Sequence, residues 1–313
     1  MCFPAIILST LIPLAPSKLF LLILDFSYTF AVCAFMPLID NWVVSETADD
    51  KKISYGSLRL WGSIGFAITA AVYGHFSMSI DVGFIFYGRA FFFLLLLILF
   101  FSNNTETSLL PGTAKKENPE IKALFAKKEY WLFFVFLFIF FLPVNAAGSF
   151  FPRLLLEMGS DNQTIAMFNA INAIVEIPFF LYVRKLTHKI GPRGLMLTGG
   201  LFMILRLFGF ASASSIPLIL ASHLCVAPYI TLFMPGFIFY SHSIAPNNTR
   251  AFTLTSLQGF AMGLAGMIGS YSAGIIVDSS GIRSLYFLGF ALCLAAMVLF
   301  IFSSFWLKEK RAN

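Results

Sequence analysis

Runs of about twenty apolar residues, separated by short polar segments, recur along this 313-residue chain. A helix of that length crosses the roughly 30 Å hydrocarbon core of a bilayer and satisfies its own backbone hydrogen bonds there. Hydrophobic residues make up 58% of the chain and charged residues only 12%, which leaves too little polar surface for a soluble domain. The pattern therefore predicts an all-α polytopic membrane protein.

We expect about ten membrane-spanning helices. Their approximate ranges are 2–15, 18–39, 57–78, 82–102, 131–149, 163–183, 194–212, 216–241, 252–276 and 284–306. The longest polar segment, residues 102–130, contains Pro, Gly and mixed charge, which is typical of a linker. We therefore expect an N-terminal bundle in residues 1–102, a cytoplasmic linker in 103–130 and a C-terminal bundle of about six helices in 131–313.

Basic residues are distributed unevenly between the two sets of loops. If the C-terminal segment KEKR is cytoplasmic, alternating loops place on the same side Lys51, Lys52, Arg59, Lys115, Lys116, Lys122, Lys127, Lys128, Arg184, Lys185, Lys189, Arg193, Arg250, Lys308, Lys310 and Arg311. Only Lys18, Arg153 and Arg283 then face outside. Because cytoplasmic loops carry the excess of Lys and Arg, we expect a multi-pass protein of the plasma (inner) membrane with both termini cytoplasmic. The same bias accounts for the net charge of +6 without nucleic-acid binding.

Motifs of enzymes and metal sites are missing from the sequence. It contains no HExxH, no G-x-S-x-G, no P-loop and no cluster of Cys and His. We therefore expect no enzymatic activity and no cofactor. The four cysteines lie in apolar runs without metal-type spacing, which is typical of buried free thiols; they are Cys2, Cys33, Cys225 and Cys293.

Ionisable residues inside the apolar runs are the strongest functional candidates, because each costs on the order of 3 kcal/mol at the bilayer centre. In the segment FNAINAIVEIPFF, Asn169, Asn172 and Glu176 follow one another at steps of three and four residues. That spacing places them on one face of a helix. The polar face indicates the wall of a hydrated cavity, and a structural hydrogen-bond network between helices is the alternative.

Two more charged or titratable residues lie in the runs that follow. Arg206 stands near the middle of its run, and an arginine cannot lose its proton, so it needs a carboxylate, an anion or water. Glu176, in the preceding run, is the natural partner. His223 could exchange a proton near neutral pH, although a histidine that only hydrogen-bonds within a bundle is the more common case.

Asp40 and Arg59 form a candidate pair in the first half. Asp40 ends one apolar run and Arg59 begins the next, so two antiparallel helices can bring them together as an ion pair or a shared substrate site. The alternative is an interfacial Asp and an Arg whose side chain extends to the membrane surface. The roles of Asp25 and Arg89 stay open.

The segments PLIDNWVVSE and ISYGSLRLWGSIGFAI resemble the major facilitator superfamily, and within it the branch of lactose-permease-like and phenylpropionate-permease-like proton symporters. Asp40 precedes a Y-G-x-x-R-x-W-G-S-type motif made of Tyr55, Gly56, Arg59, Trp61, Gly62 and Ser63. The resemblance continues through Glu176, Arg206 and His223, and so covers essentially the whole chain.

This resemblance implies a two-bundle fold that moves a small polar or aromatic solute, such as a sugar, nucleoside or aromatic acid, by alternating access coupled to protons. It implies that Asp40 and Arg59 bind substrate, and we add Asn145, Asn169 and Asn172 as further candidate substrate-binding residues. It implies a proton-coupling network of Glu176, Arg206 and His223. The expected partners are the solute, protons and the lipid bilayer, and we expect a monomer.

The sequence departs from the branch in two places. Lactose-permease-like members carry a carboxylate one helical turn after the His, where this chain has Val226, which argues against lactose and leaves Glu176 as the proton acceptor. The family's first two helices also have no counterpart here, which fits the uneven division of about four and six spans. A truncated, non-transporting membrane protein, such as a sensor or partner subunit, is therefore the alternative function. An intramembrane enzyme is a second alternative that no motif supports.

Overall fold

The apolar runs form helices in the computed structural model, as the sequence predicts. The structure describes residues 1–32, 35–47, 55–76, 83–102, 119–246 and 249–312, and within these ranges it contains no strand. The first half comprises α1 (Cys2–Leu11), η1 (Ile12–Leu14), α2 (Lys18–Val32), α3 (Phe35–Thr47), α4 (Tyr55–Phe76) and α5 (Gly83–Ser102). The second half comprises α6 (Pro119–Ala126), α7 (Lys128–Glu157), α8 (Asn162–Ser212), α9 (Ile216–His223), α10 (Val226–Ile244), α11 (Arg250–Ser256), η2 (Leu257–Gly263), α12 (Leu264–Ser280) and α13 (Ile282–Ala312).

Six of the described helical stretches are long and apolar enough to cross a membrane. They are Gly83–Ser102, Lys128–Glu157, Gln163–Ser212, Ile216–Ile244, Arg250–Ser280 and Ile282–Ser303. The longest of them is two helices, because Gly191 has φ +69° and ψ 173° and interrupts the helical backbone before Pro192. A left-handed φ of this kind is readily adopted by glycine, which has no Cβ. The chain is a multi-pass membrane protein.

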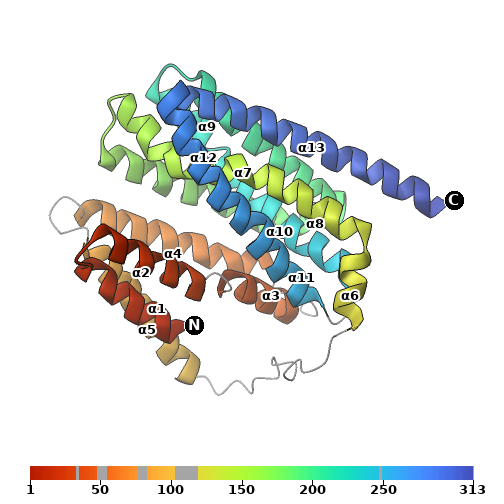
Figure 1. Ribbon diagram of the computed structural model, residues 1–313, viewed down its shortest axis with the longest axis horizontal. Helices are drawn as coiled ribbons and strands as arrows, with labels where there is room; N and C mark the ends of the chain where they lie inside the picture. Colours follow the sequence, from red (N-terminus) through yellow and green to blue (C-terminus); the bar gives the residue numbers. More distant parts are fainter. Residues whose placement is uncertain (33–34, 48–54, 77–82, 103–118, 247–248, 313) are drawn as a thin grey trace.

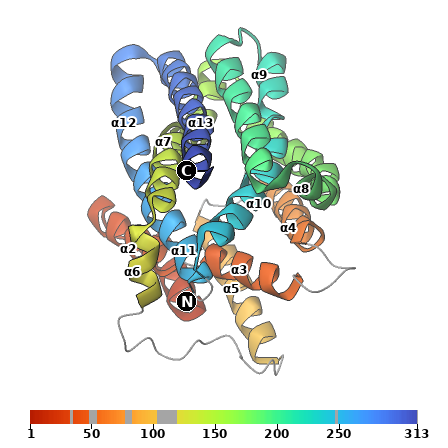
Figure 2. The ribbon, with the colours of Figure 1, turned by 90° about the vertical axis from the view of Figure 1, so that its right-hand side faces the viewer.

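The helices form two groups, which Figures 1 and 2 show from two directions. Helices α7 to α13 lie together, and α1 packs against α2 and α5 in a smaller group. Helices α3 and α4 pack on the larger group, where α4 runs along α8 and α3 lies against α11. The interface between α4 and α8 brings together residues of the two halves of the sequence.

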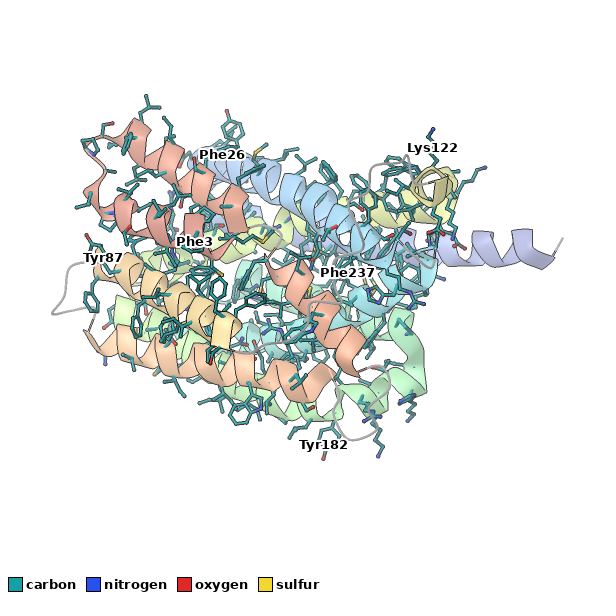
Figure 3. The ribbon with its side chains drawn as sticks, turned by 90° about the horizontal axis from the view of Figure 1, so that it is seen from below. Phe3, Phe26, Tyr87, Lys122, Tyr182 and Phe237 are labelled. Carbon is teal, nitrogen blue, oxygen red and sulfur yellow. The ribbon has the colours of Figure 1, made fainter. Side chains whose placement is uncertain are left out.

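Aromatic side chains fill the core of the larger group. The ring of Phe140 stacks on that of Phe233 at 4.8 Å, and Phe136 stacks on Phe300 at 4.3 Å between ring centroids. Figure 3 shows Phe237 inside this core, where it is fully buried. Phe26 and Tyr182 instead point away from the protein, and such exposed apolar side chains are what a surface in contact with lipid requires.

The second part of the predicted linker is helical, while residues 103–118 lie outside the described part of the chain. Helix α6 carries Glu120 in its first turn, where a negative charge stabilises a helix. Leu124 in the same helix is completely buried. After α6, Lys127 donates a 2.9 Å hydrogen bond to the carbonyl of Ile244 at the end of α10. The segment before α7 is therefore fixed to the second group of helices.

Three of the four cysteines are free, as the sequence predicts. Cys2 and Cys225 are half-buried, and Cys293 is buried. Cys33 lies outside the described residues.

Candidate functional site

Glu176, in the first half of α8, lies at the interface with α4. Its side chain is 8% exposed, and each of its carboxylate oxygens accepts a hydrogen bond. The hydroxyl of Ser63 on α4 donates to Oε2 at 2.6 Å, and the amide of Asn172 donates to Oε1 at 3.1 Å. The bond from Ser63 has the short length typical of a hydroxyl bound to a charged carboxylate. The site thus joins a helix of the first half of the sequence to a helix of the second half.

Arg59 supplies a positive charge to the same site. It lies four residues before Ser63, so the two side chains share one face of α4. The Arg59 guanidinium is close enough to Glu176 to act on it electrostatically. The Arg59 guanidinium lies over Gly62: a Cβ added at that glycine would be 2.5 Å from Nη1 of Arg59. Glycine at position 62 therefore leaves the space that the guanidinium occupies.

A proline lies beside this site in α8. Pro178 follows Glu176 by two residues and has no backbone N–H, so the carbonyl of Ile174 loses its helical donor. Prolines inside membrane helices are places where the helix bends and where backbone groups become free to bind other groups. The sequence thus combines a carboxylate, an amide and a locally weakened helix within two turns.

The predicted polar face of α8 is confirmed for Asn172 and Glu176, which hydrogen-bond to each other. Asn169 lies one turn earlier on the same helix and is half-buried. Asp40 is 8% exposed on α3, a helix that contacts both α4 and α11. Its pairing with Arg59 stays a prediction.

Asn145 belongs to a different contact. Its amide donates a 3.0 Å hydrogen bond to the carbonyl of Phe141 in its own helix. A Cβ on Gly266 of α12 would lie 3.2 Å from the Asn145 amide nitrogen, so this side chain packs at the interface of α7 and α12. In the part of the chain that the structure describes, Asn145 is not among the groups around Glu176.

The sequence analysis expected Arg206 to pair with Glu176, but the two side chains do not interact in the described part of the structure. Within the described ranges, the groups that act on Arg206 are Tyr286, Tyr229 and Cys225. Its guanidinium carbon lies 4.9 Å from the ring centre of Phe210. The charge of Arg206 acts on His223, whose ring stacks on that of Phe151 at 4.3 Å between ring centroids. Arg206 and His223 therefore form a second cluster inside the C-terminal helices. Glu176 is not part of it, and its carboxylate faces α4.

Sequence reasoning did not identify Ser63 as a site residue. It recorded this serine only as part of a motif, although the spacing of four residues from Arg59 could have placed both on one face. It also missed the π-helical turn η2 (Leu257–Gly263), a kind of irregularity that is frequent at functional sites. Within η2 the carbonyl oxygen of the Gln258 side chain is buried and has no hydrogen-bond partner among the described residues.

Comparisons with known proteins place this chain in a family. Residues 1–288 match the MFS_1 like family. The sucrose permease of Escherichia coli is 25% identical over 299 residues, which are 88% of this chain and 66% of that protein. The maltose permease of Geobacillus stearothermophilus is 23% identical over 266 residues, covering 85% of this chain and 66% of the relative. The uncharacterized transporter YwbF of Bacillus subtilis (strain 168) is 26% identical over 260 residues, covering 81% and 63%.

A solved structure shares the fold. The nucleoside transporter NupG superimposes with a TM-score of 0.73 at 16% identity, over 96% of this chain and 81% of that chain. The chain spans about two thirds of the length of the curated relatives that it matches, 63% to 66%. Because the family match covers most of the chain, the protein belongs to the MFS_1 like family of the major facilitator superfamily.

Proposed function

We propose that this protein is a proton-coupled secondary transporter of a small neutral polar solute, and that Glu176 is the group that exchanges the proton. The observation that supports the proposal is the buried hydrogen bond from Ser63 on α4 to Glu176 on α8. A titratable carboxylate at the contact of α4 with α8 experiences any movement of one of these helices against the other.

The coupling follows from what surrounds the carboxylate. Alternating access moves the first half of a transporter against the second half, so α4 and α8 change their contact. The Glu176 carboxylate accepts the hydrogen bond from Ser63 and interacts with the charge of Arg59. When these contacts are lost, the proton affinity of the carboxylate changes. Proton binding and helix movement are then linked in both directions, as two ligands of one two-state system are.

The side chains of the site favour a neutral, hydroxyl-rich solute. Arg59, Asn172 and Asn169 offer hydrogen-bond donors and acceptors on the facing helices α4 and α8. The positive charge of Arg59 already acts on Glu176, so an acidic solute would add an uncompensated negative charge there. Two of the curated relatives are named for maltose and sucrose, and the structural neighbour is named for nucleosides. Sugars and nucleosides are therefore the first candidates, ahead of aromatic acids.

The test is uptake into proteoliposomes that contain the purified chain. An inward proton gradient is imposed, and a panel of radiolabelled sugars, nucleosides and aromatic acids is offered, with protein-free liposomes as the control. We expect saturable uptake of a sugar or nucleoside above its equilibrium level, and loss of that accumulation when a protonophore is added. Accumulation that is unchanged by the protonophore would contradict proton coupling. Absence of uptake for the whole panel would contradict transport of these solutes.

A further inference from the structure

A second group of buried polar side chains lies among the C-terminal helices. Arg206, His223 and Tyr229 are 5%, 4% and 4% exposed. Each carries polar atoms without a hydrogen-bond partner among the described residues: Nε of Arg206, both ring nitrogens of His223 and the hydroxyl of Tyr229. Arg206 acts electrostatically on both of the other side chains, so the three belong to one cluster. None of them is a partner of Glu176 in the described part of the chain.

The cluster carries a positive charge and lacks a carboxylate of its own. The acidic side chains that act most strongly on Arg206 among the described residues are Tyr286, Tyr229 and Cys225, which are neutral when protonated. The hydroxyl of Tyr286 donates to the carbonyl of Ala147 at 3.4 Å and is thereby satisfied. Glu157 acts on Tyr286 from one end of α7, but its side chain is 46% exposed and pairs with Arg153 at 3.1 Å. The guanidinium charge is therefore not balanced by a buried acid among the residues described.

The charge and the hydrogen-bond donors of the cluster indicate which ligand it could bind. An arginine keeps its charge, and a buried charge without a partner is strongly unfavourable. The guanidinium and the tyrosine hydroxyl are hydrogen-bond donors, and a neutral histidine adds one N–H. Aromatic rings lie beside the cluster: the ring centre of Phe151 is 4.3 Å from that of His223, and the ring centre of Phe210 is 4.9 Å from the guanidinium carbon. Buried donors without partners among the described residues, one positive charge and neighbouring aromatic rings fit a small acceptor with a single negative charge.

We propose that Arg206, His223 and Tyr229 bind a small monovalent anion inside the C-terminal helices, either a halide or the carboxylate group of a small solute. This site is separate from the Glu176 site and does not depend on the transport proposed for it. It assigns the cluster to the binding of negative charge rather than to the proton pathway.

Arg89 provides a matched comparison. It is also an arginine in an apolar helix, α5, but its Nε donates to the Ser9 hydroxyl at 3.1 Å. Its guanidinium lies 3.6 Å from the ring centre of Tyr28, and both Arg89 and Asp25 act on that tyrosine. Its Nη2 is also buried without a partner among the described residues, but Asp25 acts on the same tyrosine, so a carboxylate lies in the surroundings of this arginine and we expect no anion site there.

The experiment measures the unfolding temperature of the purified protein in detergent, at constant ionic strength, with the bulky sulfonate HEPES as the background anion. Sodium chloride and sodium acetate are titrated separately. Because a ligand that binds only the folded state stabilises it, the wild-type temperature should rise by about 3 °C for each tenfold increase in anion concentration above the dissociation constant. Arg206→Met should lose this rise and unfold no earlier than wild type in HEPES alone. Arg89→Met should retain the rise.

The two titrations separate the sources of the anion. A response to chloride identifies an inorganic halide site, a response to acetate identifies a carboxylate site, and a response to both identifies a site for either. No response of the wild type to chloride or acetate, or an unchanged response in Arg206→Met, overturns the proposal. If Arg206→Met does not fold, Tyr229→Phe decides, because it removes a single hydroxyl. It should raise the half-maximal anion concentration by about tenfold, and an unchanged concentration overturns the proposal.

Discussion

Ser63 on α4 donates a 2.6 Å hydrogen bond to Glu176 on α8, and the two residues are 113 positions apart in the sequence. The bond crosses between the two halves of the chain, at an interface where the carboxylate is 8% exposed. Among the described residues, this contact combines a titratable group, burial and a partner from the other half of the chain.

Ser63→Ala should weaken transport without removing it. The substitution deletes one charge-assisted hydrogen bond, whose net contribution is about 1.5–3 kcal/mol, while Asn172 still donates to the carboxylate. We expect the solute that the uptake panel identifies to accumulate at least about tenfold more slowly. Thr69→Val is the matched control, because Thr69 is also on α4 and donates to the carbonyl of Gly65 in its own helix. Equal rates for Ser63→Ala and wild type would show that the contact is not used.

Gly62→Ala should displace Arg59 and leave the fold intact. The new methyl group would lie 2.5 Å from Nη1 of Arg59, and a flexible guanidinium moves more easily than a backbone. We expect a loss of initial uptake rate with an unfolding temperature close to that of wild type. Gly65→Ala is the control on the same helix, because a Cβ there meets nothing within 4 Å. Normal uptake by Gly62→Ala would mean that the position of the guanidinium is unimportant.

Gly269→Ala should destabilise the protein through helix packing. A Cβ at Gly269 would overlap the backbone carbonyl of Leu142, which cannot move aside without separating α12 from α7. Overpacking of this kind costs about 1–3 kcal/mol, so we expect a clearly lower unfolding temperature in detergent. Gly274→Ala, on the same helix, meets nothing within 4 Å and should unfold at the wild-type temperature or slightly above it. Identical temperatures for the two variants would contradict this packing.

Local sequence rules predicted the parts of the fold that depend on short distances along the chain. The apolar run expected at residues 82–102 is α5 (Gly83–Ser102). The steps of three and four residues placed Asn172 and Glu176 on one face, and the two side chains hydrogen-bond there. Both results follow from the period of the α-helix and from the length needed to cross a bilayer, which are properties of single segments.

The partner of Glu176 could not be predicted in the same way. Arg206 was expected because it lies one helix later, but Glu176 hydrogen-bonds to Ser63, which lies before the linker. Spacing rules relate residues within a helix or in consecutive helices, whereas the contact of α4 with α8 depends on how helices far apart in the sequence pack together. Arg206 and His223 were expected to form one network with Glu176, and the lack of a buried acid beside Arg206 among the described residues became visible only in the packed structure.

The most direct test of the account compares proton-driven accumulation with solute exchange in Glu176→Gln. Proteoliposomes are loaded for each assay with the solute that the uptake panel identifies. A gradient of about one pH unit corresponds to about 1.4 kcal/mol and can sustain about tenfold accumulation at one proton per solute. Glu157→Gln, which alters an exposed glutamate paired with Arg153, is the control and should accumulate solute as wild type does. We predict that Glu176→Gln exchanges solute but no longer accumulates it. Accumulation by Glu176→Gln at the wild-type level would contradict the role of Glu176 as the proton-exchanging group.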